Sequence, residues 1–101
     1  MSLSTEELTT LKIFFSGKPV KKAFLFGSFS RGEDTLESDV DILVELDYSQ
    51  HIGLSFVRMK SDIEKAINKK IDLVSMQSLS SHLLPFIEKD KKLIYERKDW
   101  R

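Results

Sequence analysis

Residues 27–44, with the sequence GSFSRGEDTLESDVDILV, decide how the rest of this chain is arranged. The apolar run 23–26 precedes them, and the segment ends in a second apolar run, 42–44. Short apolar runs bounded by turn-forming residues are typical of buried strands. We therefore expect a turn of small residues to leave one strand, and a pair of acidic residues to enter the next.

The acidic pair is the chemical feature of this segment. Side chains alternate across a strand, so Asp39 and Asp41 are expected on one face, with Val40 and Ile42 on the other. Two carboxylates about 4 Å apart repel by about 4 kcal/mol at an effective dielectric constant of about 20. Such a pair needs a cation, a raised pKa or full solvation. Oxygen ligands without cysteine favour Mg²⁺ or Mn²⁺ over zinc.

The remaining elements follow from periodicity and capping signals. A capping box at Ser4 and Glu7 predicts a helix over about 4–15. Apolar spacing predicts a second helix over about 53–69. A helical turn over 29–32 and a helix near 83–87, which Pro85 either starts or kinks, complete the helices. Strands are expected at 20–26, 40–46, 71–74 and 93–95. This alternation predicts an α/β or α+β fold, a mixed sheet covered by helices.

A third acid, Asp72, interrupts the apolar run 71–74. A central strand rarely accommodates an unpaired charge, which makes this acid conspicuous. If its strand pairs beside the strand of Asp39 and Asp41, three carboxylates converge on one patch. Two-metal phosphoryl-transfer sites have this arrangement.

Gly27 and Ser28 complete the pattern. Glycine lets the backbone approach a phosphate closely, and the serine hydroxyl and N–H can donate to phosphate oxygens. Gly-Ser, ten residues, then Asp-x-Asp resembles the signature of the DNA polymerase β-like nucleotidyltransferase superfamily. The longer form GSFSRGEDTLESDVDILVE resembles the minimal nucleotidyltransferase (MNT) family, whose pattern is near GSxARGxxxxxSDxDLxV. The chain departs from it at Ser30, where Ala is usual, and at Ile42, where Leu is usual.

The resemblance covers about residues 20–96 and implies one minimal nucleotidyltransferase domain over 1–101, with the polymerase β-like fold. It further implies the antitoxin of a HEPN/MNT toxin–antitoxin pair, which transfers AMP from ATP to a tyrosine hydroxyl of the HEPN ribonuclease toxin with two Mg²⁺ ions, or Mn²⁺ in their place. By the same resemblance, the catalytic and metal-binding residues would be Asp39, Asp41 and Asp72, and the nucleotide-binding residues Gly27, Ser28, Arg31 and Ser38.

Simpler interpretations stay open for each residue. Asp39 and Asp41 could cap a turn in water, Ser28 could be an ordinary turn serine, and Asp72 could be a structural edge acid paired with a lysine. Arg31 could bind phosphate or form a surface ion pair. The phenylalanines are expected in the core, among them Phe24, Phe26, Phe56 and Phe86.

Two other functions are compatible with the sequence. In one, the chain is a catalytically silent antitoxin that neutralises a HEPN toxin by direct binding. In the other, it modifies a small molecule such as an aminoglycoside, although relatives of that kind usually need an added domain for the acceptor.

A chain of 101 residues is long enough for a single modest core.

The composition narrows the range of partners and locations. Lys+Arg and Asp+Glu both number 16, so no net field attracts nucleic acid, and we expect no direct nucleic-acid binding. The absence of cysteine excludes disulfides and thiolate chemistry and fits the cytoplasm. No apolar run is long enough to span a bilayer, and no signal-peptide pattern is present. We therefore expect a cytoplasmic protein that does not bind membranes.

Overall fold

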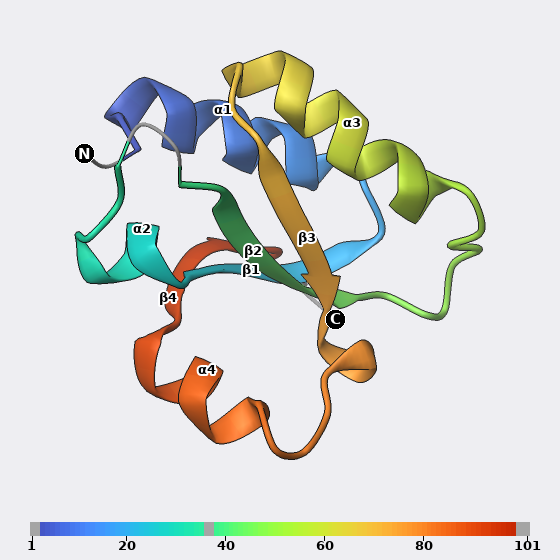
Figure 1. Ribbon diagram of the computed structural model, residues 1–101. Coiled ribbons are helices and arrows are strands. Elements are labelled where there is room, and N and C mark those ends of the chain that lie inside the picture. Colours follow the sequence, from blue (N-terminus) through green and yellow to red (C-terminus); the bar gives the residue numbers. More distant parts are fainter. Residues whose placement is uncertain (1–2, 36–37, 99–101) are drawn as a thin grey trace.

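The structure is a computed structural model that describes residues 3–35 and 38–98. Within these residues one mixed sheet has the strand order β3-β2-β1-β4 (Figure 1). β1 pairs antiparallel with both β2 and β4, whereas β2 pairs parallel with β3. The strands are β1 (Val20–Phe26), β2 (Val40–Leu46), β3 (Ile71–Ser75) and β4 (Lys92–Glu96). The predicted α+β class, with a mixed sheet, is confirmed.

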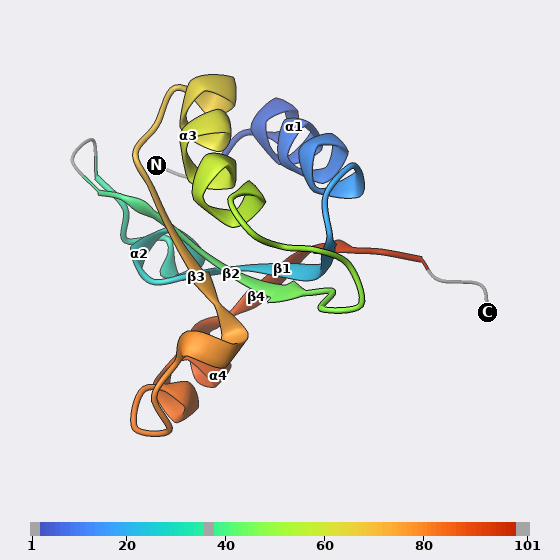
Figure 2. The same cartoon turned by 90° about the vertical axis from the view of Figure 1, so that its right-hand side faces the viewer.

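Helices lie on both sides of this sheet. Figure 2 shows α1 (Thr5–Ser16) and α3 (Ser55–Ile67) against one face and α4 (Leu84–Asp90) on the opposite side. The two shortest helical segments are α2 (Ser28–Arg31) and the 3₁₀ turn η1 (Met76–Ser78). In the described part of the chain, none of these helices combines the length and the apolar character needed to cross a membrane.

The predicted capping box starts α1. The Ser4 hydroxyl accepts a hydrogen bond from the Glu7 N–H at 3.0 Å, and the Glu7 carboxylate accepts one from the Ser4 N–H at 2.8 Å. Two N–H groups of the first turn, which lack partners inside a helix, are thereby satisfied. Pro85 lies in the first turn of α4, so it starts that helix and does not kink it.

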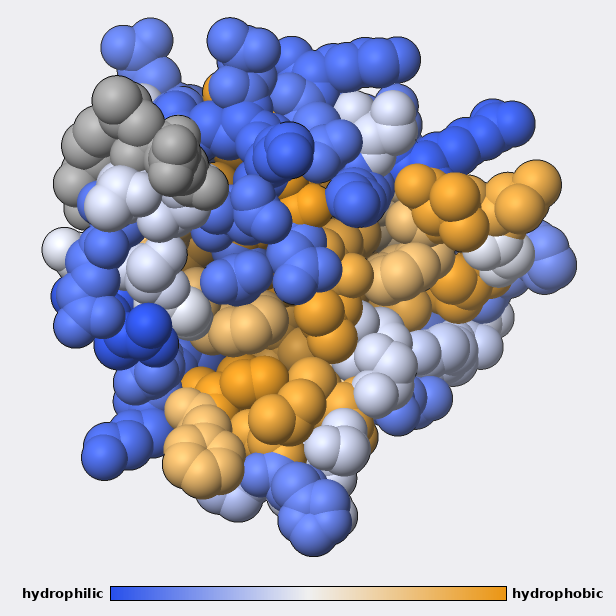
Figure 3. Space-filling view, in the orientation of Figure 1, coloured by the Kyte–Doolittle hydropathy of each residue, from blue (hydrophilic) through white to orange (hydrophobic). Residues whose placement is uncertain are grey.

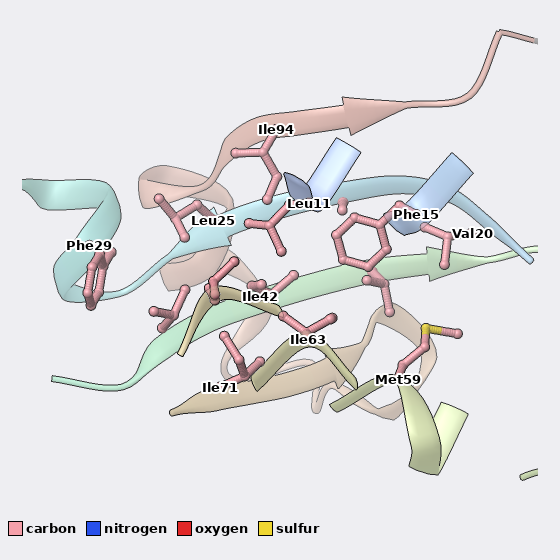
Figure 4. Close-up of a cluster of buried hydrophobic side chains, with 14 of the residues drawn as sticks. Leu11, Phe15, Val20, Leu25, Phe29, Ile42, Met59, Ile63, Ile71 and Ile94 are labelled. Atoms are coloured by element: carbon pink, nitrogen blue, oxygen red, sulfur yellow. The ribbon is translucent and has the colours of Figure 1, made fainter. Parts of the chain in front are cut away.

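The core lies between the sheet and the pair α1 and α3 (Figure 4). Alternate β2 residues, Val40, Ile42 and Val44, are fully buried in it, together with Phe15 and Ile63. Since side chains alternate along a strand, the intervening residues of β2 point to the opposite face of the sheet, the side on which α4 lies. The strand pattern that fills the core thus also directs Asp41 away from it.

Asp72 and Phe86 are both exposed, and of the two only the expectation for Phe86 was wrong. β3 is an edge strand, so the sheet does not have to bury the charge of Asp72. Phe86 was expected in the core, yet 71% of it is exposed, because α4 contributes no buried residue. The pattern of apolar residues in α4 indicated a helix correctly, but it did not indicate what that helix packs against.

Candidate active site

Two strand pairings bring the candidate residues to one end of the sheet. Asp41 is the register partner of Phe26 in β1 and of Asp72 in β3. Residues opposite one another in a ladder share a face, so the Asp41 and Asp72 side chains project from the same face, away from the core. Gly27 directly follows Phe26, and the Gly-Ser turn therefore lies beside the same carboxylates.

Gly27 fits its position for a steric reason. Its φ of 73° and ψ of −152° belong to a region that residues with a Cβ rarely adopt. A Cβ added to Gly27 would collide with Oδ2 of Asp41. Only glycine at position 27 therefore lets the backbone of the turn lie this close to the Asp41 carboxylate.

The carboxylates also influence one another electrostatically. The pKa of Asp41 is raised to about 6, first by burial and then by the charges of Asp72 and Asp39, while Arg31 partly opposes the shift. No hydrogen bond or ion pair joins the side chain of Asp39, Asp41 or Asp72 to another residue within 3–35 and 38–98. The lysine partner considered for Asp72 is therefore not found among these residues.

This raised pKa predicts how stability depends on pH without metal. The folded-state pKa of Asp41 lies above the ordinary value of 3.8, so its favourable contribution is complete below about pH 3.8 and lost as pH rises through about 6. Asn cannot ionise, so in EDTA Asp41→Asn should be more stable than wild type above pH 6, by about 1–2 kcal/mol after solvent screening is included. Urea unfolding at pH 4 and pH 7.5 measures this. A difference between the two proteins that does not grow with pH would contradict it.

The donor set fits a divalent cation in its chemistry. Its members offer only carboxylate oxygens, which Mg²⁺ and Mn²⁺ prefer, and a cation would relieve the repulsion that raises the pKa of Asp41. As the side chains stand, however, no three acidic or histidine residues within the described ranges form a group that could hold an ion. Binding would require the exposed carboxylates of Asp39 and Asp72 to reorient around Asp41.

The nucleotide-binding candidates lie around the same turn. Ser28 begins α2, and its carbonyl oxygen accepts the Glu33 N–H at 2.9 Å. The Ser38 hydroxyl accepts the Thr35 N–H at 2.9 Å, a contact within the loop between α2 and β2. Their predicted contacts with a nucleotide stay predictions.

Arg31 forms ion pairs in this structure. Its Nε lies 2.9 Å from Oε1 of Glu33, and its Nη1 lies 2.8 Å from Oδ2 of Asp90. The positive charge of Arg31 also offsets part of the rise in the pKa of Asp41. Arg31 therefore acts on the site electrostatically from the position it holds. Direct contact of Arg31 with phosphate stays a prediction.

Sequence reasoning missed two residues beside this turn. The buried Ser30 hydroxyl donates to the carbonyl oxygen of Asp90 at 2.8 Å, across 60 positions of the chain. The departure from the MNT pattern at Ser30 was a signal, because a serine in place of alanine brings a hydroxyl that needs a partner. Nothing in the local sequence pointed to Asp90.

Comparison with known proteins decides the family. A family model described as "Polymerase beta, Nucleotidyltransferase" matches residues 9–99. The chain belongs to this family. The resemblance inferred from the Gly-Ser and Asp-x-Asp elements is thereby confirmed, and the protein is a nucleotidyltransferase.

Two relatives of this nucleotidyltransferase are named protein adenylyltransferases. A Methanocaldococcus jannaschii protein with the provisional name protein adenylyltransferase is 37% identical over 87 residues, which cover 83% of this chain and 84% of that protein. Protein adenylyltransferase MntA of Thermococcus cleftensis is 37% identical over 62 residues, covering 61% of this chain and 62% of that protein.

Solved structures confirm the fold of this nucleotidyltransferase. One, a toxin–antitoxin crystal structure with AMP-PNP, matches with a TM-score of 0.76 at 20% identity and covers 90% of this chain and 74% of that chain. Another holds a tri-AMPylated Shewanella oneidensis HEPN toxin in complex with an MNT antitoxin, with a TM-score of 0.71 at 18% identity, 94% of this chain and 74% of that chain. At these identities the likeness establishes the fold.

Proposed function

We propose that this nucleotidyltransferase is the antitoxin of a HEPN/MNT pair and transfers AMP from ATP to a tyrosine hydroxyl of its toxin. The single observation that supports this best is the register of β2 with β3, which sets Asp41 beside Asp72 and against the Gly27 turn. The names of the relatives support protein adenylylation, and the solved complex with a tri-AMPylated HEPN toxin supports the partner.

The residues of the site would divide the chemistry among them. The turn at Gly27 and Ser28 would receive the triphosphate, because the backbone there has no Cβ in the way. The acceptor oxygen would bond to the α-phosphorus while the bond from that phosphorus to the bridging oxygen breaks, and pyrophosphate leaves. Asp72, exposed on the edge strand, would accept the proton of the acceptor hydroxyl.

Divalent ions would be held by Asp39, Asp41 and Asp72. When bound, they neutralise charge on the transferring phosphoryl group and the leaving group. Asp41, partly buried between its two neighbours, would be the fixed ligand of the three. The two exposed carboxylates would complete the set.

One observation favours a second candidate, a catalytically silent antitoxin. The three carboxylates do not form a ready metal-ligand group in the described part of the chain. In that case the protein would neutralise its toxin by covering a surface, without covalent change.

Transfer of the AMP group tests the proposal directly. The chain is incubated with its HEPN toxin and Mg²⁺, with ATP labelled in parallel reactions at the α-phosphate or at the γ-phosphate. Label on the toxin from the α-position alone, lost in EDTA, is the expected result, and peptide mass spectrometry should place the AMP group on tyrosine. A folded chain that binds its toxin but transfers no label would contradict the enzymatic proposal and favour the silent one.

The exposed apolar side of α4 supports a protein acceptor. Leu83, Leu84 and Phe86, at the start of α4, are 54%, 38% and 71% exposed. Figure 3 shows apolar side chains gathered on the surface where α4 lies. We call these three residues the α4 patch. α4 lies on the side of the sheet toward which Asp41 and Asp72 project, so a toxin docked on the α4 patch would be on the same side of the sheet as the carboxylates.

Charge placed on the α4 patch should weaken toxin binding. The double variant Leu83→Asp/Phe86→Asp is expected to raise the Kd for the toxin at least about 100-fold, because apolar contacts at the centre of an interface each contribute on the order of 2 kcal/mol. Isothermal titration calorimetry measures this. Leu54→Asp/Val57→Asp, which charges similarly exposed residues at the start of α3 on the other side of the sheet, is the matched control. Equal effects of both double variants would exclude the α4 patch as the docking site.

A further inference from the structure

α2 is too short to be stable by itself. It has four residues, and helix formation has an unfavourable first turn that only longer helices or tertiary contacts offset. The N–H groups of Ser30 and Arg31 both bond to the carbonyl oxygen of Gly27, so the conformation of α2 and that of the turn before it are linked. The contacts that hold α2 therefore also hold the Gly27 turn.

One anchor of α2 is apolar, and its two polar contacts with α4 converge on a single residue. Phe29 is 6% exposed and packs into the core. The Ser30 hydroxyl donates to the backbone carbonyl oxygen of Asp90 at 2.8 Å, and Arg31 Nη1 lies 2.8 Å from the Asp90 carboxylate. Ser30 is 2% exposed, so its hydrogen bond is shielded from competition by water. Asp90 thus holds two consecutive residues of α2 through two different groups.

Asp90 is itself fixed relative to the sheet. It is the last residue of α4, and the next residue, Lys91, donates its N–H to the carbonyl oxygen of Ile87 at 2.8 Å. The Lys91 ammonium lies 4.3 Å from the centre of the Phe24 ring. Phe24 belongs to β1, two residues before Phe26, the register partner of Asp41. A chain of contacts therefore runs from the strand beside Asp41, through Asp90, to α2.

We propose that Asp90 is a positioning residue for the nucleotide: it holds residues 27–31 in the orientation that receives the triphosphate. The inference rests on the proposed function and adds to it a residue that lies outside the Gly-Ser and Asp-x-Asp elements. Asp90 need not contact the nucleotide. Without the Asp90 carboxylate, α2 keeps its apolar anchor, the Ser30 hydrogen bond to the backbone carbonyl oxygen of residue 90 and the local ion pair of Arg31 with Glu33. Arg31 is then no longer tied to α4, and the Gly27 turn samples other conformations more often.

The expected kinetic signature is a change in nucleotide binding. If only a fraction of the molecules hold the turn in the conformation that binds ATP, the apparent Kd rises by the inverse of that fraction. Asp90→Ala is expected to raise the KM for ATP about tenfold, the effect of losing one hydrogen bond to a charged group, with kcat changed less than about twofold. Amide hydrogen exchange at residues 28–31 should become faster in the same variant, even without nucleotide. Asp90→Glu should recover part of the loss.

Glu33→Gln is the matched control. It removes the other carboxylate partner of Arg31, at 2.9 Å, but leaves the contacts of α2 with Asp90 intact. Its KM and its exchange at residues 28–31 should stay close to wild type. An equal rise in KM in Glu33→Gln would show that the charge of Arg31 matters and the link to Asp90 does not, which would overturn the inference.

Two further outcomes separate this inference from the proposed function. An active wild type with an unchanged KM in Asp90→Ala, whether or not exchange becomes faster, would contradict the inference alone and leave Asp90 with a purely structural role. A folded wild type that neither binds nor turns over ATP would contradict the proposed function, and the positioning role would fall with it. Thermal unfolding of each variant checks that the chain is folded.

Discussion

Replacing Asp39 and Asp41 together with asparagine is expected to lower the rate of AMP transfer at least about 1,000-fold, since the charge that holds the divalent ions is removed. Asparagine keeps the size of each side chain, so the fold should persist. Loss of the Asp41 charge should even stabilise the metal-free protein near neutral pH, because that carboxylate ionises against its neighbours. The measurement is α-phosphate label on the toxin per unit time at saturating ATP and Mg²⁺.

Asp62→Asn is the control for this experiment. Asp62 is an exposed acid on α3, on the opposite side of the sheet, and its replacement should leave transfer unchanged. The double variant also separates the two candidate functions. If Asp39→Asn/Asp41→Asn neutralises the toxin as well as the wild type does, and both need at least one copy per toxin, neutralisation is by binding. If the wild type neutralises at substoichiometric levels and the variant does not, neutralisation is by catalysis.

Gly27→Ala is expected to lower AMP transfer about 100-fold, because displacement of reacting groups by about 1 Å can have an effect of that size. The new methyl group would collide with Oδ2 of Asp41, which lies at the far end of that side chain. The collision should therefore displace the carboxylate from the site more than it destabilises the fold. The positive φ of 73° adds about 1 kcal/mol of backbone strain.

Gly32→Ala separates the collision from the strain. Gly32 has nearly the same φ, 72°, but a Cβ added there would meet nothing within 4 Å. Gly32→Ala should lose about 1 kcal/mol in urea unfolding and keep most of its activity. Gly27→Ala should lose more stability, because its ψ of −152° lies outside the left-handed helical region of Gly32, and it should lose most of its activity. Equal losses of activity would mean that backbone strain in the turn, and not contact with Asp41, explains the effect.

The sequence by itself determined the elements and part of the site. Periodic apolar residues and capping signals are local, so the α-helices and strands could be predicted with boundaries within three residues of those observed. The same holds for Gly27 followed by Ser28, and for Asp39 and Asp41, whose spacing along one strand end is fixed by the chain itself. These local elements were also sufficient to indicate the nucleotidyltransferase family.

Only the tertiary structure decided which distant residues meet. Asp72 lies beside Asp41 because β3 pairs in parallel with β2 in one particular register, after the intervening α3 has crossed the core face. Asp90 reaches Ser30 because α4 returns to the sheet on the opposite side. Phe86 is exposed because α4 buries none of its residues. Local patterns report whether a segment is helical or extended, whereas strand partners, register and burial depend on how apolar faces stack between segments far apart in the chain.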